Sequence, residues 1–224
     1  DLVLRIPMSH RMPVALVTGF DPFGGEAVNP SQQIVQALHG QIVAGHRVIG
    51  ATLPTEFAAA PPMLEKLIAR HRPALVLALG QAGGREGISL ERVAINLIDA
   101  RIPDNAGAQP VDARIVDNAA NAYFSTLPVK AMLQRLRDAG IPASLSQTAG
   151  TFVCNQVFYA LMHVLRRRRA RGGFVHVPYL PEQAARHANA PSMPLETMIH
   201  GVGLALETAL TTTADAHYAA GSLD

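Results

Sequence analysis

The sequence has 224 residues, of which 49% are hydrophobic and 16% charged, with a formal net charge of +2. This length suits one substantial core, so we expect a single domain over residues 1–224. The composition excludes a disordered or collagen-like chain, and the small excess of base excludes a broad nucleic-acid interface. No apolar run approaches the roughly 18 residues of a membrane span, and a lone cysteine cannot form an internal disulfide. These features predict a cytoplasmic protein.

The first eleven residues do not look like an export signal. Arg, Pro and His are scattered through "DLVLRIPMSHR", where a secretory segment needs an unbroken apolar stretch. Met8 and Met12 are both candidate natural start sites. We therefore expect residues 1–11 to be an upstream extension.

Apolar runs alternate with amphipathic stretches along the chain. In chain order we predict a strand at 12–20, a helix at 29–40, a strand at 46–54, a helix at 56–71, and strands at 73–80 and 92–100. There follow a helix at 125–140, an extended segment at 142–147, a helix that includes Cys154, a strand at 172–180 and a closing helix at 195–210. The Arg166–Arg169 run is expected to cap the cysteine helix.

This alternation predicts an α/β fold, because parallel strands need crossover helices. We expect a three-layer α/β/α sandwich with a twisted, mainly parallel but mixed central sheet, of the kind seen in phosphorylases and hydrolases. Ligands in such sheets gather outside the carboxyl ends of the strands, so the loops that follow strands are the candidate sites.

The first such loop, "GFDPFGGEAVNPS" at 19–31, is rich in glycine but matches neither common nucleotide-phosphate motif. Phe20 and Phe23 are unusual among its small residues. Both rings could wall an apolar ligand pocket or fill the core, and the sequence favours neither reading.

A second loop region, "GQAGGREGISLERVAINLIDARIPDN" at 80–105, gathers polar residues beside apolar strands. Buried charges need partners, so structural ion pairs are the common outcome and catalytic roles the less common one. The polar residues of this region are Gln81, Glu91, Arg92, Asp99, Arg101 and Asp104.

Cys154, in "SQTAGTFVCNQVFYALMH", lies where polar residues give way to a helical apolar repeat. With Thr151 as N-cap, the sulfur would sit in the first turn, where free N–H groups and the helix dipole favour the thiolate. The alternative is a small hydrophobe packed in the core. Val153, Val157, Leu161 and Val164 mark the core-facing stripe, and Cys154 lies one residue off it, which favours a reachable sulfur.

A catalytic thiolate usually needs an imidazole as its proton carrier. His176, in the apolar run "GGFVHVPY", is the best candidate among nine histidines, although a core histidine bonded to backbone would fit as well. His10 lies in the leader. The others are expected to face solvent: His39, His46, His71, His163, His187, His200 and His217.

Other hydrolytic mechanisms find little support. The chain has no G-x-S-x-G or H-E-x-x-H motif, and one cysteine cannot build a thiolate-rich zinc site. We expect neither a metal nor a cofactor.

Four motifs in order, "GFDPFGGEAVNPS", "GQAGGREGISLERVAINLIDARIPDNAGAQP", "SQTAGTFVCN" and "GGFVHVPYLPEQ", closely resemble the pyroglutamyl peptidase I family of cysteine peptidases. The similarity runs from residue 13 to residue 210. The resemblance implies an α/β exopeptidase that removes N-terminal pyroglutamate from peptides through a Cys-His-Glu triad and an acyl-enzyme. It also implies no cofactor and a homo-oligomer, a dimer or a tetramer.

Carried over by motif, Cys154 would be the nucleophile, His176 the general base and acid, and Glu91 the residue that orients the imidazole. Arg101 would lie near the acyl centre. The remaining substrate-binding positions implied by the resemblance are Phe20, Phe23, Asn29, Thr55, Gln81, Ile102, Phe152 and Val153. Spacing alone does not select Glu91 over Asp99 or Asp104. Two other functions stay open: a nucleoside-phosphorylase-like enzyme and a non-catalytic receptor for lactams or peptides.

Overall fold

The computed structural model describes residues 12–222, so the expected extension at 1–11 lies outside the described part. The described residues form a seven-stranded sheet, whose strands are β1 (Val14–Phe20), β2 (Ile42–Val43), β3 (His46–Leu53), β4 (Leu75–Gln81), β5 (Ile88–Glu91), β8 (Ala143–Ser146) and β9 (Arg171–Val177). A separate antiparallel pair is formed by β6 (Val93–Ile95) and β7 (Ala122–Phe124). The helices are α1 (Pro30–Leu38), α2 (Ala60–His71), α3 (Val129–Asp138), α4 (Val153–Leu165), α5 (Pro181–Ala184) and α6 (Leu195–Thr211).

The sheet is mixed but mainly parallel, with strand order β2-β3-β1-β4-β9-β5-β8. The pairs β1–β3, β1–β4, β4–β9 and β5–β8 are parallel, whereas β2–β3 and β5–β9 are antiparallel. The predicted α/β/α sandwich with a mixed sheet is therefore confirmed.

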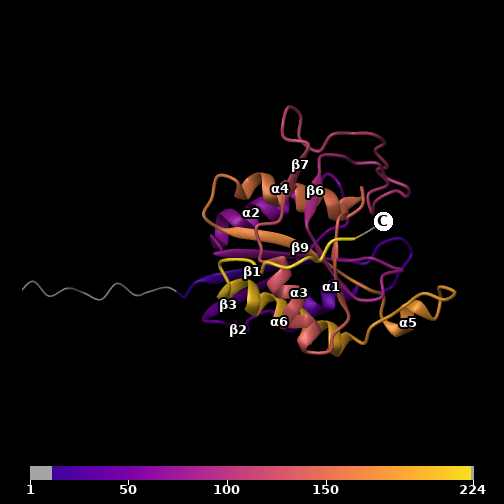
Figure 1. Cartoon of the computed structure of the whole chain (residues 1–224). Coiled ribbons are helices and arrows are strands. Elements are labelled where there is room, and N and C mark those ends of the chain that lie inside the picture. Colours follow the sequence, from indigo (N-terminus) through magenta and orange to yellow (C-terminus); the bar gives the residue numbers. More distant parts are fainter. Residues whose placement is uncertain (1–11, 223–224) are drawn as a thin grey trace, which may run out of the picture.

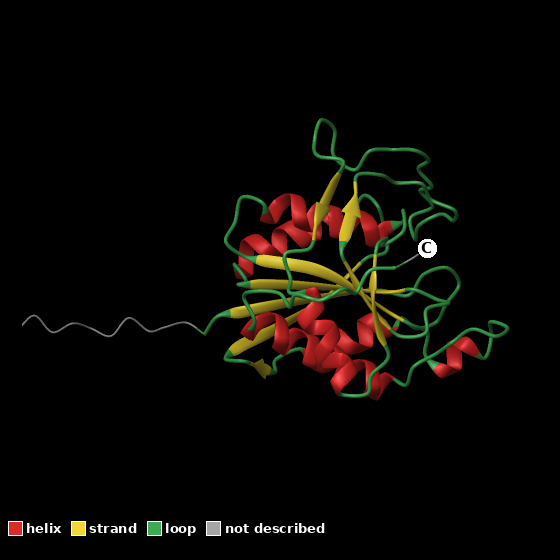
Figure 2. Ribbon diagram, viewed as in Figure 1, coloured by secondary structure: helices red, strands yellow, loops and turns green. Residues whose placement is uncertain are grey.

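Helices cover both faces of the sheet (Figures 1 and 2). On one face α1, α3 and α6 pack against strand residues such as Val17 and Leu77, and on the other α2 and α4 pack against Leu16 and Val76. Neighbouring residues of a strand thus enter different cores, as expected for strands buried on both faces. No helix among residues 12–222 has the length and apolar character to cross a membrane.

The turn from β1 into α1 depends on close backbone packing. Asn29 is the N-cap of α1, and its side-chain oxygen accepts from the Ser31 N–H at 3.0 Å. Gly19 lies so near that a Cβ there would stand 2.5 Å from the Ser31 carbonyl oxygen. A larger residue at Gly19 would therefore push the helix away from the strand.

One predicted strand is wrong in position. The segment 92–100 does not continue as one strand, because β5 ends at Glu91 and the chain leaves the large sheet at Arg92. There the Arg92 N–H donates to the Ser146 carbonyl on one side, while its own carbonyl accepts from Ser125 on the other. The apolar residues that follow form β6, which packs beside α4 rather than in the main sheet (Figure 1).

Several element ends also differ from prediction. The helix expected at 125–140 begins at Val129, after Pro128 as N-cap, and the helix expected at 56–71 begins at Ala60. The short elements β2, β5, β7 and α5 were not predicted, since two to four residues carry too little periodicity. The arginine run does cap α4, because the Arg166 guanidinium donates to the His163 carbonyl in the last turn.

Candidate active site

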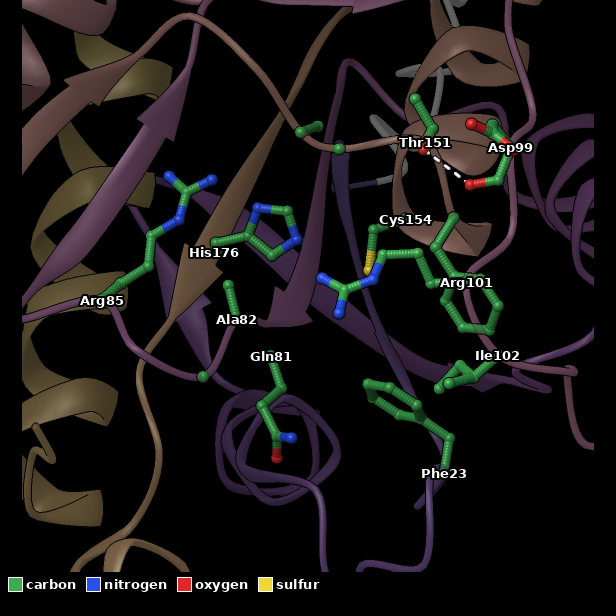
Figure 3. A pocket seen from close by; sticks show the side chains of 14 residues that line it. Phe23, Gln81, Ala82, Arg85, Asp99, Arg101, Ile102, Thr151, Cys154 and His176 are labelled. Carbon is green, nitrogen blue, oxygen red and sulfur yellow. Dashed lines mark hydrogen bonds between the residues drawn. The ribbon is translucent and has the colours of Figure 1, made fainter. Parts of the chain in front are cut away.

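A cavity of about 580 Å³ opens where β4 and β9 end and α4 begins (Figure 3). These are the carboxyl ends of two adjacent parallel strands, where the fold predicts a ligand site. The residues that line the cavity are Phe23, Gln81, Ala82, Gly83, Arg85, Asp99, Arg101, Ile102, Ala149, Gly150, Thr151, Phe152, Cys154 and His176. Segments far apart in the sequence therefore meet around one thiol.

Cys154 is the second residue of α4, and its sulfur points into the space between the His176 ring and the Arg101 guanidinium (Figure 3). Gly80 of β4 lies directly beneath it, because a Cβ at Gly80 would stand 2.7 Å from Sγ. The first turn of a helix leaves N–H groups without intrahelical acceptors, and the first turn of α4 lies at this cavity. The sulfur is thus held against the sheet beside a local source of positive potential.

Two expectations for this turn are wrong. Thr151 is not the N-cap, since Phe152 takes that place and the Thr151 hydroxyl instead donates to the Asp99 carbonyl at 2.8 Å (Figure 3). Nor is the thiolate favoured in the resting site. Burial and, to a smaller extent, the negative Glu91 raise the pKa of the Cys154 thiol to about 12, and the positive Arg85 offsets this rise only in part. The thiol therefore needs a base to give up its proton.

His176 lines the same cavity as the thiol, where such a base could act. It lies in β9, is 3% exposed, and its Nδ1 is 2.7 Å from Glu91 Oε1. The bond is made to a carboxylate and not to backbone, which removes the core-histidine alternative. With Nδ1 engaged, Nε2 is the ring nitrogen that remains to exchange protons with a group in the cavity.

The same geometry separates Glu91 from the other two acids. Asp104 is fully engaged with backbone, accepting from the N–H groups of Phe57, Ala106 and Ala108. Asp99 lies at the cavity wall near Thr151 (Figure 3). Of the three acids, Glu91 is the one whose carboxylate hydrogen-bonds to the imidazole, and it lies at the end of a strand that pairs with β9.

Arg85 completes this arrangement and was missed by the sequence analysis. Its Nη1 lies 3.1 Å from Glu91 Oε1, the oxygen that also contacts His176, and its Nη2 donates to the Thr148 carbonyl at 2.9 Å. Glu91 is 0% exposed, so a cation nearby offsets the penalty of burying its charge. The signal that could have revealed Arg85 is its place in "GGREG", the loop that leads into Glu91.

Aromatic and aliphatic side chains form the opposite wall. The centroids of the Phe23 and Phe152 rings are 6.0 Å apart. The Phe57 ring, which does not line the cavity, contacts Phe152 edge to face with a centroid distance of 5.2 Å. Ile102, which is 42% exposed, closes the rim beside Phe23 (Figure 3). The cavity is thus polar on the His176 side and apolar on the side of these rings.

Gln81 supplies an oriented amide at the floor. Its Oε1 accepts from Gln183 Nε2 at 2.8 Å, so its own NH₂ group is directed elsewhere and can donate to a ligand. Gln183, which is fully buried, is held in turn by Glu26 and the Val28 carbonyl. The amide is therefore fixed from behind by the loop that carries Phe23.

Four of the predicted substrate-binding residues do not line the cavity. Phe20 is 1% exposed and packs against Phe174 at 6.5 Å between ring centroids, which answers the open question in favour of the core. Val153 is likewise a core residue. Asn29 and Thr55 support the loop, since both hold Asp21 by hydrogen bonds. Phe23, Gln81, Arg101, Ile102 and Phe152 do line the cavity, as predicted.

The other histidines mostly stay outside the site. His39, His187, His200 and His217 are exposed as expected, whereas His46, His71 and His163 are half-buried. His163 contacts the Tyr123 hydroxyl at 2.9 Å, and burial is the main cause that lowers its pKa. Among residues 12–222, no three His, Cys, Asp or Glu side chains are grouped to hold a metal ion.

Comparisons with known proteins show the family of the chain. The family model described as "Pyroglutamyl peptidase" matches residues 13–212. A pyrrolidone-carboxylate peptidase of Cupriavidus taiwanensis is 56% identical over 215 residues, which cover 95% of this chain and 100% of that protein. Another, of Erwinia tasmaniensis, is 52% identical over 94% of this chain and 99% of that protein.

Solved structures give the same result. The crystal structure of pyroglutamyl peptidase I from Bacillus amyloliquefaciens matches with a TM-score of 0.90 at 43% identity, covering 93% of this chain and all of that one. The pyrrolidone carboxyl peptidase of Thermococcus litoralis matches with a TM-score of 0.85 at 40% identity, covering 89% and 94%. At these identities the likeness extends beyond the fold to the sequence.

Proposed function

This chain belongs to the pyroglutamyl peptidase family, and from that premise we propose that it is a cysteine exopeptidase that removes the N-terminal pyroglutamyl residue from peptides. Cys154 is the nucleophile, His176 the general base and acid, and Glu91 the residue that orients the imidazole. The observation that carries the assignment is the meeting of the chain's single thiol with a carboxylate-bound histidine in one cavity.

The reaction starts from a neutral thiol. As Sγ attacks the pyroglutamyl carbonyl carbon, its proton passes to Nε2 of His176, and the imidazolium is stabilised by Glu91 at Nδ1. Collapse of the tetrahedral intermediate breaks the C–N bond, and Nε2 returns the proton to the leaving amine. Water then attacks the thioester with His176 again as base, which releases pyroglutamate and restores the thiol.

The negative charge of the tetrahedral intermediate forms at the start of α4. The backbone N–H of Cys154 is in the first helical turn and donates to the developing oxyanion, while the Arg101 guanidinium adds positive charge at the same side of the cavity. Groups fixed before the reaction need little reorganisation when the charge appears. This stabilisation compensates for the unfavourable ionisation of the buried thiol.

Recognition of the substrate follows from the two walls. The lactam ring is compact and uncharged, so it packs between Phe23, Phe152 and Ile102, and the Gln81 amide donates to the lactam carbonyl. An ordinary N-terminal residue would bring an ammonium group against apolar rings. It would also leave the Gln81 donor unpaired, so such substrates are rejected.

We propose further that the protein works in the cytoplasm as a homo-oligomer, a dimer or a tetramer, with one domain per subunit. The cytoplasm is supported by a lone cysteine that forms no disulfide, and the homo-oligomer is what the resemblance to the family implies. Light scattering of the purified protein tests this point, and a monomer at micromolar concentration contradicts it.

The proposed activity is tested with a fluorogenic pyroglutamyl arylamide in phosphate-free buffer. Hydrolysis is expected, and incubation with iodoacetamide at mildly alkaline pH should abolish it in step with the labelling of one sulfur per chain. Saturating substrate should slow the loss of activity and the labelling of the sulfur equally. Turnover that survives complete labelling contradicts the assignment, because the chain has no second thiol.

A further inference from the structure

A second cavity, of about 630 Å³, adjoins the active site and has no part in the chemistry described so far. Its walls are the turn 84–87 on one side and residues 142–146 with Thr148 on the other, and Ser89 lies between them. We call it the β8 groove. Its lining combines serine and threonine hydroxyls with the charged Arg85 and Glu86 and has no aromatic residue, unlike the wall around Phe23.

The β8 groove and the active-site cavity meet at Arg85. Arg85 lines both cavities, and its guanidinium donates to the carbonyl of Thr148, a residue of the β8 groove, at 2.9 Å. The neighbours Gly83 and Ala149 line the active-site cavity, whereas Gly84 lines the groove. A ligand that passes over this guanidinium reaches one cavity from the other. The groove is therefore an extension of the active site.

The strand register gives the groove its direction. Ser89 of β5 is paired with His176 of β9 on one side and with Ser144 of β8 on the other. Directly paired residues place their side chains on the same face of a sheet, at strand spacings of about 4.8 Å. The row His176, Ser89, Ser144 thus leads from the catalytic imidazole to the edge of the sheet.

The polarity of the active site determines which part of a substrate lies toward the β8 groove. The Phe23 ring lies across the cavity from His176 and Arg85 (Figure 3). The Phe152 ring is 6.0 Å from it, and the two rings suit the pyroglutamyl ring. The leaving amine must face Nε2 of His176 to receive its proton. The peptide that continues from this amine is then on the Arg85 side, at the entrance of the β8 groove.

The far wall of the groove can bind an extended peptide. Within residues 12–222, β8 is the last strand of the large sheet, so one of its edges has no partner strand. The Pro142 carbonyl accepts from the N–H of Ile88 in β5, and the Ser146 carbonyl accepts from the N–H of Arg92, just after β5. Because hydrogen-bonding groups alternate along a strand, the backbone N–H and C=O groups of Ala143 and Leu145 face outward. An added strand could pair with them.

We propose that the β8 groove binds the residues that follow pyroglutamate in a peptide substrate, as an extended segment beside β8. This inference rests on the proposed function, because it takes the scissile bond to lie at Cys154. The four residues of β8 span about 13 Å at about 3.3 Å each, which matches three to four substrate residues. The protein would then favour peptides over small pyroglutamyl amides.

A series of pyroglutamyl peptides with one to four alanines after the pyroglutamate tests the groove. In the wild type, kcat/KM should rise with each added residue, on the order of tenfold over the series, and level off once β8 is covered. A kcat/KM that does not change with length overturns the proposal. If no peptide and no arylamide is hydrolysed, the proposed function itself fails, so the two failures are distinct.

A bulky substitution tests the location. Ser144→Trp fills the groove from an exposed position, so the ratio of kcat/KM for the longest peptide to that for the arylamide should fall about tenfold. Gln147→Trp is the matched control, since Gln147 is exposed three residues away and does not line the groove. It should keep the wild-type ratio.

A backbone variant covers the case in which Ser144→Trp fails to fold. Ala143→Pro removes an outward N–H but no bond to β5, which an edge strand tolerates. The same ratio should fall in this variant. An unchanged ratio in a folded Ser144→Trp or Ala143→Pro protein contradicts binding beside β8.

Discussion

Replacement of Gly80 by alanine tests how tightly the nucleophile is held. The added Cβ would stand 2.7 Å from Cys154 Sγ and 2.9 Å from Phe174 Cζ, whereas ordinary contact begins near 3.4 Å. The sulfur must therefore move by about 0.7 Å, or the strand and helix must separate. Misplacement of a reacting group by about 1 Å can reduce a rate about 10²-fold, so we expect a loss in kcat of this order.

The same clash strains the core beneath the site. Overpacking by one methyl group costs about 1–3 kcal/mol, so the melting temperature should also fall by a few degrees. Steady-state kinetics on a pyroglutamyl arylamide and a thermal melt measure the two effects. Gly203→Ala is the control, because a Cβ there meets nothing within 4 Å and alanine favours its helix, α6. A Gly80→Ala enzyme with wild-type kcat would refute the close packing of sulfur on strand.

Two further changes probe the charges around the thiol. Arg85→Gln removes the cation beside buried Glu91 and should lower kcat about 10- to 100-fold. Arg85→Lys keeps a positive charge and should recover part of this loss. Equal kcat in the wild type and both variants would exclude a positioning role for Arg85. Because burial raises the pKa of the Cys154 thiol to about 12, the thiolate fraction grows with pH throughout the accessible range. The rate of alkylation by iodoacetamide should rise about tenfold per pH unit from pH ~7 to pH ~10. A plateau near neutrality would instead show a preformed thiolate.

The sequence is sufficient for the fold class and for finding the thiol and the imidazole that line one cavity. Cys154 and His176 stand out because each is a polar exception in an apolar element, and the carboxyl ends of parallel strands bring such positions together. Phe23 and Gln81 follow from the same rule, since both lie in or before loops that begin at strand ends.

Glu91 could not be selected from its spacing. Its contact with His176 depends on β5 lying antiparallel to β9, a pairing between segments 85 residues apart that no local pattern reports. The strand predicted at 92–100 even placed Glu91 outside the sheet. Only the resemblance of the sequence motifs to a known family favoured Glu91 over Asp99 and Asp104.

The state of the thiol was beyond local reasoning as well. A helix N-terminus alone favours the thiolate, but here burial against Gly80 and the nearby Glu91 act in the other direction and prevail. Both depend on tertiary packing. The first-turn position of Cys154 therefore serves the charge that forms on the substrate oxygen more than the resting charge on sulfur.

The most direct test of the whole account is the kcat/KM of Cys154→Ser on a pyroglutamyl arylamide, measured beside a thermal melt. A hydroxyl is a far weaker nucleophile, so kcat/KM should fall by about 10⁴-fold or more while the melting temperature stays within a few degrees of the wild type. A folded Cys154→Ser protein that keeps activity within tenfold of the wild type would place the chemistry elsewhere.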